Sequence, residues 1–100
     1  MDSTLTRWRN DTPGTAQRNH LNNAGASLMP TPVLDAMQQH LALESTAGGY
    51  EAADARAAEI GDAYEAVARL VGARAENIAI VASATAAFVQ AMSAFDFAPG

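Results

Sequence analysis

The sequence predicts an α/β fold that is mostly helical over these 100 residues, with a first parallel strand near residues 77–82. Apolar residues recur with helical spacing over 31–47 and again over 50–71, which predicts two long helices. Residues 77–81 form a short continuous apolar run, typical of a strand buried in a parallel sheet. The sequence contains no second strand to pair with this run, so we expect the chain to be a truncated piece of a larger α/β protein.

The segment before the first long helix is predicted to lack a large element of its own. Residues 1–19 are polar, with Trp8 as their only large aromatic side chain and a turn signal at Pro13-Gly14. Residues 20–27 are rich in small side chains and predict an extended stretch followed by a tight loop. We therefore expect an N-terminal arm over 1–19, with or without a short helix, that docks on another surface, and the N-terminal part of an α/β domain over 20–100.

The helices are delimited by local signals. Thr31 suits the N-cap of the first long helix, Pro32 suits its first turn, and Gly48-Gly49 predicts its end. The second long helix is predicted over about 50–71, with Gly72 as its stop. The inward positions are expected to be Val33, Leu34, Met37 and Leu41 in the first helix, Ala53, Ala57, Ile60, Tyr64, Val67 and Val71 in the second, and Phe88, Met92 and Phe95 in a third helix after the strand.

The junction between the predicted strand and the third helix is the most informative feature. In a parallel sheet, ligands bind beyond the carboxyl ends of the strands, and Ser83-Ala84-Thr85 occupies that position. The start of a helix presents unpaired N–H groups and a partial positive charge. The small side chains over 82–87 would let an anion approach the backbone. The junction is therefore either a phosphate cradle or only a helix start capped by Ser83 or Thr85.

Composition excludes several classes of function. The net charge is −5, and all six basic residues are arginines, which disfavours nucleic-acid binding and removes lysine-based covalent catalysis from this segment. The chain has no cysteine, so disulfides, thiolate metal sites and a cysteine nucleophile are excluded. No apolar run approaches the length of a membrane span, and the first ten residues show no signal peptide. We expect a cytoplasmic protein.

Other chemical motifs are absent or ambiguous. Neither a G-x-G-x-x-G nor a P-loop sequence follows the strand, and the isolated His20 and His40 predict no metal site. The Asn22-Asn23 pair either binds a carboxylate or only makes a turn. Tyr50 is either a ligand contact at a loop tip or the first residue of a helix.

Three strings in this order carry a family resemblance: Leu-Asn-Asn-Ala-Gly-Ala-Ser at 21–27, Gly-Gly-Tyr-Glu-Ala-Ala at 48–53, and the strand with Ser-Ala-Thr at 83–85. Together they resemble the start of the class V aminotransferase-fold enzymes, which are fold-type-I enzymes that use pyridoxal 5′-phosphate (PLP). The group includes cysteine desulfurases, selenocysteine lyases, isopenicillin N epimerases and hercynylcysteine sulfoxide C–S lyases. The resemblance spans about residues 20–100.

The resemblance implies roles for particular residues. In the family an Ala-Thr pair at a helix start grips the PLP phosphate, which implies cofactor binding by Ser83, Ala84 and Thr85. An Asn-Ala stretch lines the substrate side, which implies Asn23 and Ala24. The loop from Gly48 to Tyr50 would approach a site shared between two subunits, so a homodimer with Tyr50 in the substrate pocket is implied. No catalytic residue is assigned here, because the lysine that attaches the cofactor would lie beyond residue 100.

Two departures from the family pattern affect the expected reaction. Desulfurases commonly have Gly-Ala-Thr-Glu and Asp-Asn-Ala, whereas this chain has Ser-Ala-Thr-Ala at 83–86 and Asn-Asn-Ala at 22–24. The string at 48–53 is more similar to the C–S lyase branch. The expected function is a PLP-dependent enzyme acting on an amino-acid substrate, closest to a C–S lyase or cysteine desulfurase. The alternatives are an aminotransferase or epimerase of the same fold, and a non-catalytic acidic helical module that binds a protein partner.

Overall fold

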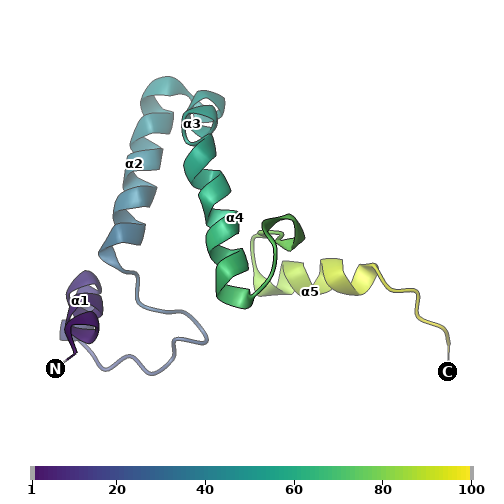
Figure 1. Ribbon diagram of the computed structural model, residues 1–100, viewed down its shortest axis with the longest axis horizontal. Coiled ribbons are helices and arrows are strands. Elements are labelled where there is room, and N and C mark those ends of the chain that lie inside the picture. The colour runs from purple at the N-terminus through teal and green to yellow at the C-terminus, as the bar shows by residue number, and fades with distance from the viewer. Residues whose placement is uncertain (1, 100) are drawn as a thin grey trace. The chain divides into compact units, whose positions relative to one another are not determined.

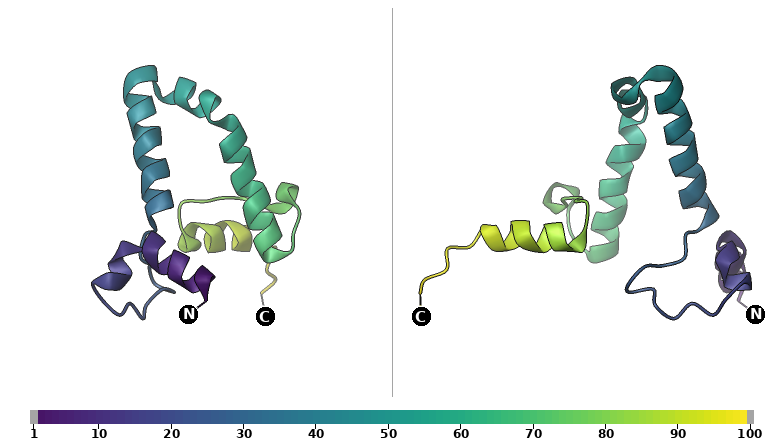
Figure 2. Two further views of the ribbon diagram at one scale, coloured as in Figure 1. Left: turned by 60° about the vertical axis from the view of Figure 1, so that its left-hand side comes forward. Right: turned by 180° about the vertical axis from the view of Figure 1, so that it is seen from behind.

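The computed structural model describes residues 2–99 of the chain, and its regular elements there are α-helices and short 3-10 helices (Figures 1 and 2). The chain divides into two compact units, Met1–Ala55 and Arg56–Gly100. The boundary expected at residues 19–20 falls inside the first unit, and the assignment of 20–100 to one domain stays a prediction.

The N-terminal arm of the first unit is folded into two short helices. Helix α1 spans Ser3–Asp11, and the Thr4 amide donates to Asp2 Oδ1 at 3.0 Å, which caps its N-terminus. The 3-10 helix η1 spans Pro13–Ala16. The Thr15 hydroxyl donates to the Thr12 carbonyl at 2.8 Å, so the turn between the two helices is closed by its own polar groups.

Helices α2 (Thr31–Ala47) and α3 (Gly49–Ala55) form a helical hairpin. The expected N-cap at Thr31 is wrong by one residue. Pro30 occupies that position, because its carbonyl already accepts the Val33 and Leu34 amides at 3.1 and 3.2 Å. The predicted end of α2 is confirmed at Gly48, which has φ 99° and ψ 155°. Where α3 packs on α2, Ala52 is completely buried.

The single helix predicted over 50–71 is two helices, because the chain leaves helical geometry at Arg56 (φ −108°, ψ 15°). Helix α4 begins after it and spans Ala57–Val71. Its predicted stop is confirmed. Gly72 lies in the left-handed region (φ 69°), where its amide donates to the Ala68 carbonyl. The second unit continues with the 3-10 helix η2 (Ala75–Asn77).

The segment expected as a strand is a linker without a partner in the described part of the chain. Asn77 belongs to η2, and Ile78 is extended (φ −101°, ψ 128°). Residues 79–82 carry no regular structure, and no strand is assigned over 2–99. A strand needs a neighbour for its ladder of hydrogen bonds, so the parallel sheet and the fold-type-I class stay predictions. Helix α5 (Ala84–Ser93) follows and ends before Phe95, which therefore lies outside the predicted helical face.

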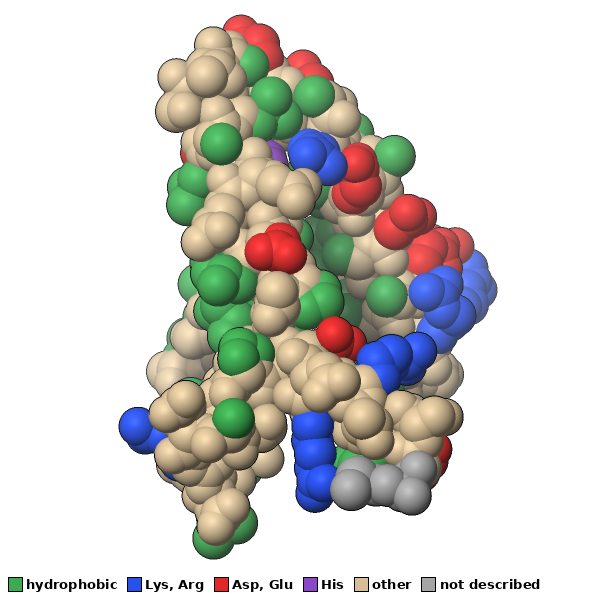
Figure 3. All heavy atoms as spheres, turned by 90° about the vertical axis from the view of Figure 1, so that its left-hand side faces the viewer, with side chains coloured by type: hydrophobic (Ala, Val, Ile, Leu, Met, Phe, Trp, Pro, Cys, Tyr) green, Lys and Arg blue, Asp and Glu red, His purple; other side chains and the backbone are tan. Residues whose placement is uncertain are grey.

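The described residues bury very little apolar surface. Among residues 2–99, only Ala52 and Ala68 are buried, and the large apolar side chains predicted to face inward on α2, α4 and α5 are exposed or at best half-buried. Figure 3 shows hydrophobic side chains open to solvent along the face that α2 presents. None of the helices over 2–99 has both the length and the apolar character required to cross a bilayer.

Candidate functional site

The start of α5 has the geometry of an open helix N-terminus. Ser83 is extended (φ −161°, ψ 164°) and serves as the N-cap, because the Ala86 amide donates to its Oγ at 3.1 Å. The Ala87 amide donates to the Ser83 carbonyl at 3.0 Å. Within the described chain, the amides of Ala84 and Thr85 and the Thr85 hydroxyl have no hydrogen-bond partner. All three residues from 83 to 85 are exposed.

This geometry confirms that Ser83 caps the helix, and it is also compatible with a phosphate-binding site at the same helix start. Ser83 Oγ accepts one hydrogen bond, and its O–H remains able to donate. The first turn of α5 contains no acidic residue, so no carboxylate opposes an anion there. Two unpaired amides, two hydroxyl donors and the positive end of a ten-residue helix are suited to a phosphate group.

The predicted substrate residues Asn23 and Ala24 lie in a closed turn. The Asn22 carbonyl accepts the Gly25 and Ala26 amides at 3.2 and 3.1 Å, and Asn22 Oδ1 also accepts the Gly25 amide at 3.3 Å. A Cβ atom at Gly25 would lie 2.7 Å from Asn22 Nδ2, so any larger residue there would have to displace the Asn22 side chain. The turn exposes both Asn23 and Ala24.

Tyr50 is the second residue of α3, and 89% of its surface is exposed. It does not meet the turn within the first unit, because the turn precedes α2 and Tyr50 follows it. Helix α2 has 17 residues and is therefore about 25 Å long. The expected role of Tyr50 was in a site shared between two subunits, and this prediction stays open. Ser83, Ala84 and Thr85 belong to the other unit.

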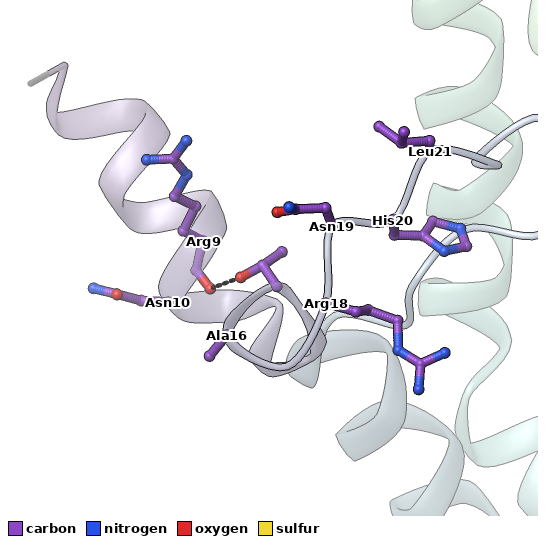
Figure 4. Close-up of a pocket in the computed structure, with 8 residues that line it drawn as sticks. Arg9, Asn10, Ala16, Arg18, Asn19, His20 and Leu21 are labelled. Carbon is purple, nitrogen blue, oxygen red and sulfur yellow. Dashed lines mark hydrogen bonds between the residues drawn. The ribbon is translucent and has the colours of Figure 1, made fainter.

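One cavity of the first unit was not predicted from the sequence. It has a volume of about 770 Å³ and is open to solvent. Figure 4 shows Arg9 and Asn10 on α1, and Arg18 and His20 on the segment that follows η1. Its full lining is Arg9, Asn10, Thr15, Ala16, Arg18, Asn19, His20 and Leu21. These side chains include two guanidinium groups and no carboxylate, so the cavity favours anionic or neutral polar ligands over cations.

Two arginine–glutamate ion pairs of the second unit each join residues that are close in the sequence. Arg56 Nη1 is 3.0 Å from Glu59 Oε1, and Arg74 Nε is 3.3 Å from Glu76 Oε2. Backbone hydrogen bonding and the Arg56 side chain lower the pKa of Glu59, and the Arg74 side chain lowers the pKa of Glu76. Both carboxylates are exposed to solvent, so each of these surface ion pairs contributes little to stability.

Comparison with curated proteins finds one relevant similarity. The chain is 42% identical over 71 residues to a Mycobacterium tuberculosis (strain CDC 1551 / Oshkosh) protein named "Probable hercynylcysteine sulfoxide lyase". The match covers 71% of this chain but only 18% of the relative, so the chain corresponds to a small part of that protein's length. No protein-family profile matches the chain, and no solved structure matches it significantly.

Proposed function

We propose that this chain is the N-terminal part of a PLP-dependent C–S lyase of the class V aminotransferase fold, acting on an amino-acid substrate. The observation that carries the proposal is the start of α5, where the exposed amides of Ala84 and Thr85, next to the N-cap residue Ser83, have no partner within residues 2–99. The similarity to a protein named as a sulfoxide lyase supports the same class of reaction. That name also makes hercynylcysteine sulfoxide the first substrate to assay.

The residues of this site fit the phosphate of PLP. The Ala84 and Thr85 amides would donate to phosphate oxygens, and the Thr85 and Ser83 hydroxyls would add two donors. The methyl side chain of Ala84 leaves the backbone accessible. PLP, when bound, withdraws electrons from the substrate Cα, so that a sulfur group on Cβ can leave.

The other predicted residues would act on the substrate side. Asn23 and Ala24 are exposed in a turn that backbone hydrogen bonds close, so they would present an amide group and a small surface to the amino-acid substrate. Tyr50 would reach the site of a second copy in a homodimer. This segment has no lysine and would bind the cofactor without attaching it covalently.

The phosphate role is tested by removing single donors in the protein at its full natural length and measuring PLP affinity. Thr85→Ala removes a hydroxyl donor to a charged group, which is worth about 1.5–3 kcal/mol, so we expect about a 10-fold to 150-fold weaker Kd. Thr85→Ser should retain most of the affinity. Thr46→Ala is the matched control, because the Thr46 hydroxyl bonds only to backbone carbonyls of its own helix.

A second variant tests the backbone donors directly. Ala84→Pro deletes the first free amide, and the first position of a helix tolerates proline. The extended conformation of Ser83 is also the one that a residue before proline prefers. PLP affinity should fall while the helix persists in circular dichroism. Unchanged affinity in both Thr85→Ala and Ala84→Pro would rule out this cradle.

The uncovered apolar side chains of α2 and α4 favour one alternative, a helical module that binds a protein partner without a cofactor. The two functions differ in a simple measurement. A C–S lyase binds PLP and releases an α-keto acid and ammonia from a β-sulfur amino acid, whereas the module does neither. An aminotransferase or epimerase of the same fold would bind PLP without releasing the sulfur group.

A further inference from the structure

The turn at Asn22–Ala26 is closed by a side chain that the sequence analysis left without a role. His20 Nε2 lies 2.7 Å from the carbonyl oxygen of Ala26, so the imidazole links the segment just before the turn to the last residue of the turn. His20 is half-buried, whereas residues 21–27 are all exposed. The turn is therefore anchored from outside its own residues by a side chain that is partly buried.

The chemistry of this contact fixes the tautomer of His20. A carbonyl oxygen can only accept a hydrogen bond, so Nε2 must carry the proton and donate it. The ring therefore has the Nε2–H form when neutral, and Nδ1 is left as its second nitrogen.

The two adjacent asparagines have different environments in this turn. Asn22 Oδ1 accepts the Gly25 amide at 3.3 Å, and its side chain lies close against Gly25. The Asn23 side chain has no hydrogen-bond partner within the described residues. The geometry thus assigns the structural part to Asn22 and leaves the Asn23 amide free for a ligand.

We propose that His20 is a positioning residue that locks the Asn22–Ala26 turn, so that Asn23, and not Asn22, contacts the amino-acid substrate. The proposal rests on the proposed function for the identity of the ligand. The hydrogen bonds within the turn and the His20–Ala26 bond are all exposed to water and are individually weak, so each added bond matters to the order of the turn. The His20–Ala26 bond closes the turn from outside and limits the positions that Asn23 can take.

The lock can be tested without substrate or cofactor, in the protein at its full natural length. Nitrogen-15 NMR of the imidazole should show the Nε2–H tautomer of His20. His20→Leu should accelerate hydrogen exchange of the Gly25 and Ala26 amides by about threefold to tenfold, the range expected for one hydrogen bond. His20→Gln should restore slow exchange, because its amide nitrogen is the same number of bonds from Cβ as Nε2. An Nδ1–H tautomer, or unchanged exchange in His20→Leu, would overturn the lock.

The assignment of the asparagines is tested by substrate kinetics on the same variants. Asn23→Ala should raise KM without changing amide exchange in the turn, whereas Asn22→Ala should change both. Asn22→Asp retains the acceptor oxygen and should change neither. His20→Leu should raise KM, leave PLP affinity unchanged and be rescued by His20→Gln. If Asn23→Ala left KM unchanged, the ligand contact would be refuted. If the protein bound no PLP while the tautomer and exchange results held, the proposed function would fail and the lock would stand.

Discussion

Gly48 and Gly49 are neighbouring glycines, yet the structure predicts opposite effects on stability when each is replaced by alanine. Gly48 has φ 99° and ψ 155°, a region that is essentially restricted to glycine. Forcing a Cβ into that region costs about 1–3 kcal/mol. Gly49 is the first residue of α3, its φ is not positive, and a Cβ there would meet nothing within 4 Å. Gly49→Ala should therefore be neutral or stabilise the hairpin by up to about 1 kcal/mol.

The assay is hydrogen exchange of the Ala52 amide, which donates to the Gly48 carbonyl at 2.9 Å and reports opening of the α2–α3 connection. Gly48→Ala should accelerate this exchange by about 5-fold to 150-fold, and Gly49→Ala should leave it unchanged or slow it. A Cβ at Gly48 would also lie 2.5 Å from Glu51 Oε2, the mobile end of a flexible side chain. The double variant Gly48→Ala/Glu51→Ala should therefore remain destabilised, because the backbone is the main source of the cost. Equal exchange in the two single variants would refute the reasoning.

Three further predictions concern other elements. Ser83→Ala removes the N-cap of α5 and should cost about 1 kcal/mol in urea unfolding, whereas Ser83→Asp should retain the cap but weaken PLP binding, because a carboxylate would repel the phosphate. Ala52→Leu should overpack the α2–α3 contact by about 1–3 kcal/mol, while Ala53→Leu, at an exposed position, should change the unfolding free energy by less than about 0.5 kcal/mol. Arg74→Gln should raise the pKa of Glu76 towards its ordinary value of 4.5 in a carboxyl NMR titration. Because the Glu76 pKa is lowered in the fold, the stabilising effect of Arg74 is present above the pKa of the unfolded chain and is lost as the pH falls through the folded value.

Helix ends that depend on the backbone chemistry of a single residue could be predicted from the sequence. Gly72 ends α4 in the left-handed conformation that glycine permits, and Ser83 caps α5 through its hydroxyl. The break at Arg56 was missed, because no glycine or proline marks it and the apolar spacing continues across it. The expected inward positions are also mostly uncovered here, since periodicity identifies an apolar face without identifying what packs against it.

The candidate sites also differ in whether a local sequence pattern can predict them. The helix start at Ser83-Ala84-Thr85 was predictable from local pattern, and the structure gives it unpaired donors. The cavity beside α1 depends on how η1 folds the chain back, which no periodic signal encodes. The contact from His20 to Ala26 joins residues six positions apart in an irregular segment, and no sequence pattern predicts it either. Whether residues 77–82 form a strand depends on neighbouring strands with which they can pair, and a local pattern does not show those neighbours.

The hydrogen bonds described here join residues at most six positions apart in the sequence. Elements built from such short-range bonds can form while a polypeptide is still being synthesised, because no distant segment is needed to complete them. The apolar faces of α2, α4 and α5 would then be exposed on nascent helices. Transiently exposed apolar surface of this kind promotes aggregation, which is the hazard that chaperones counter.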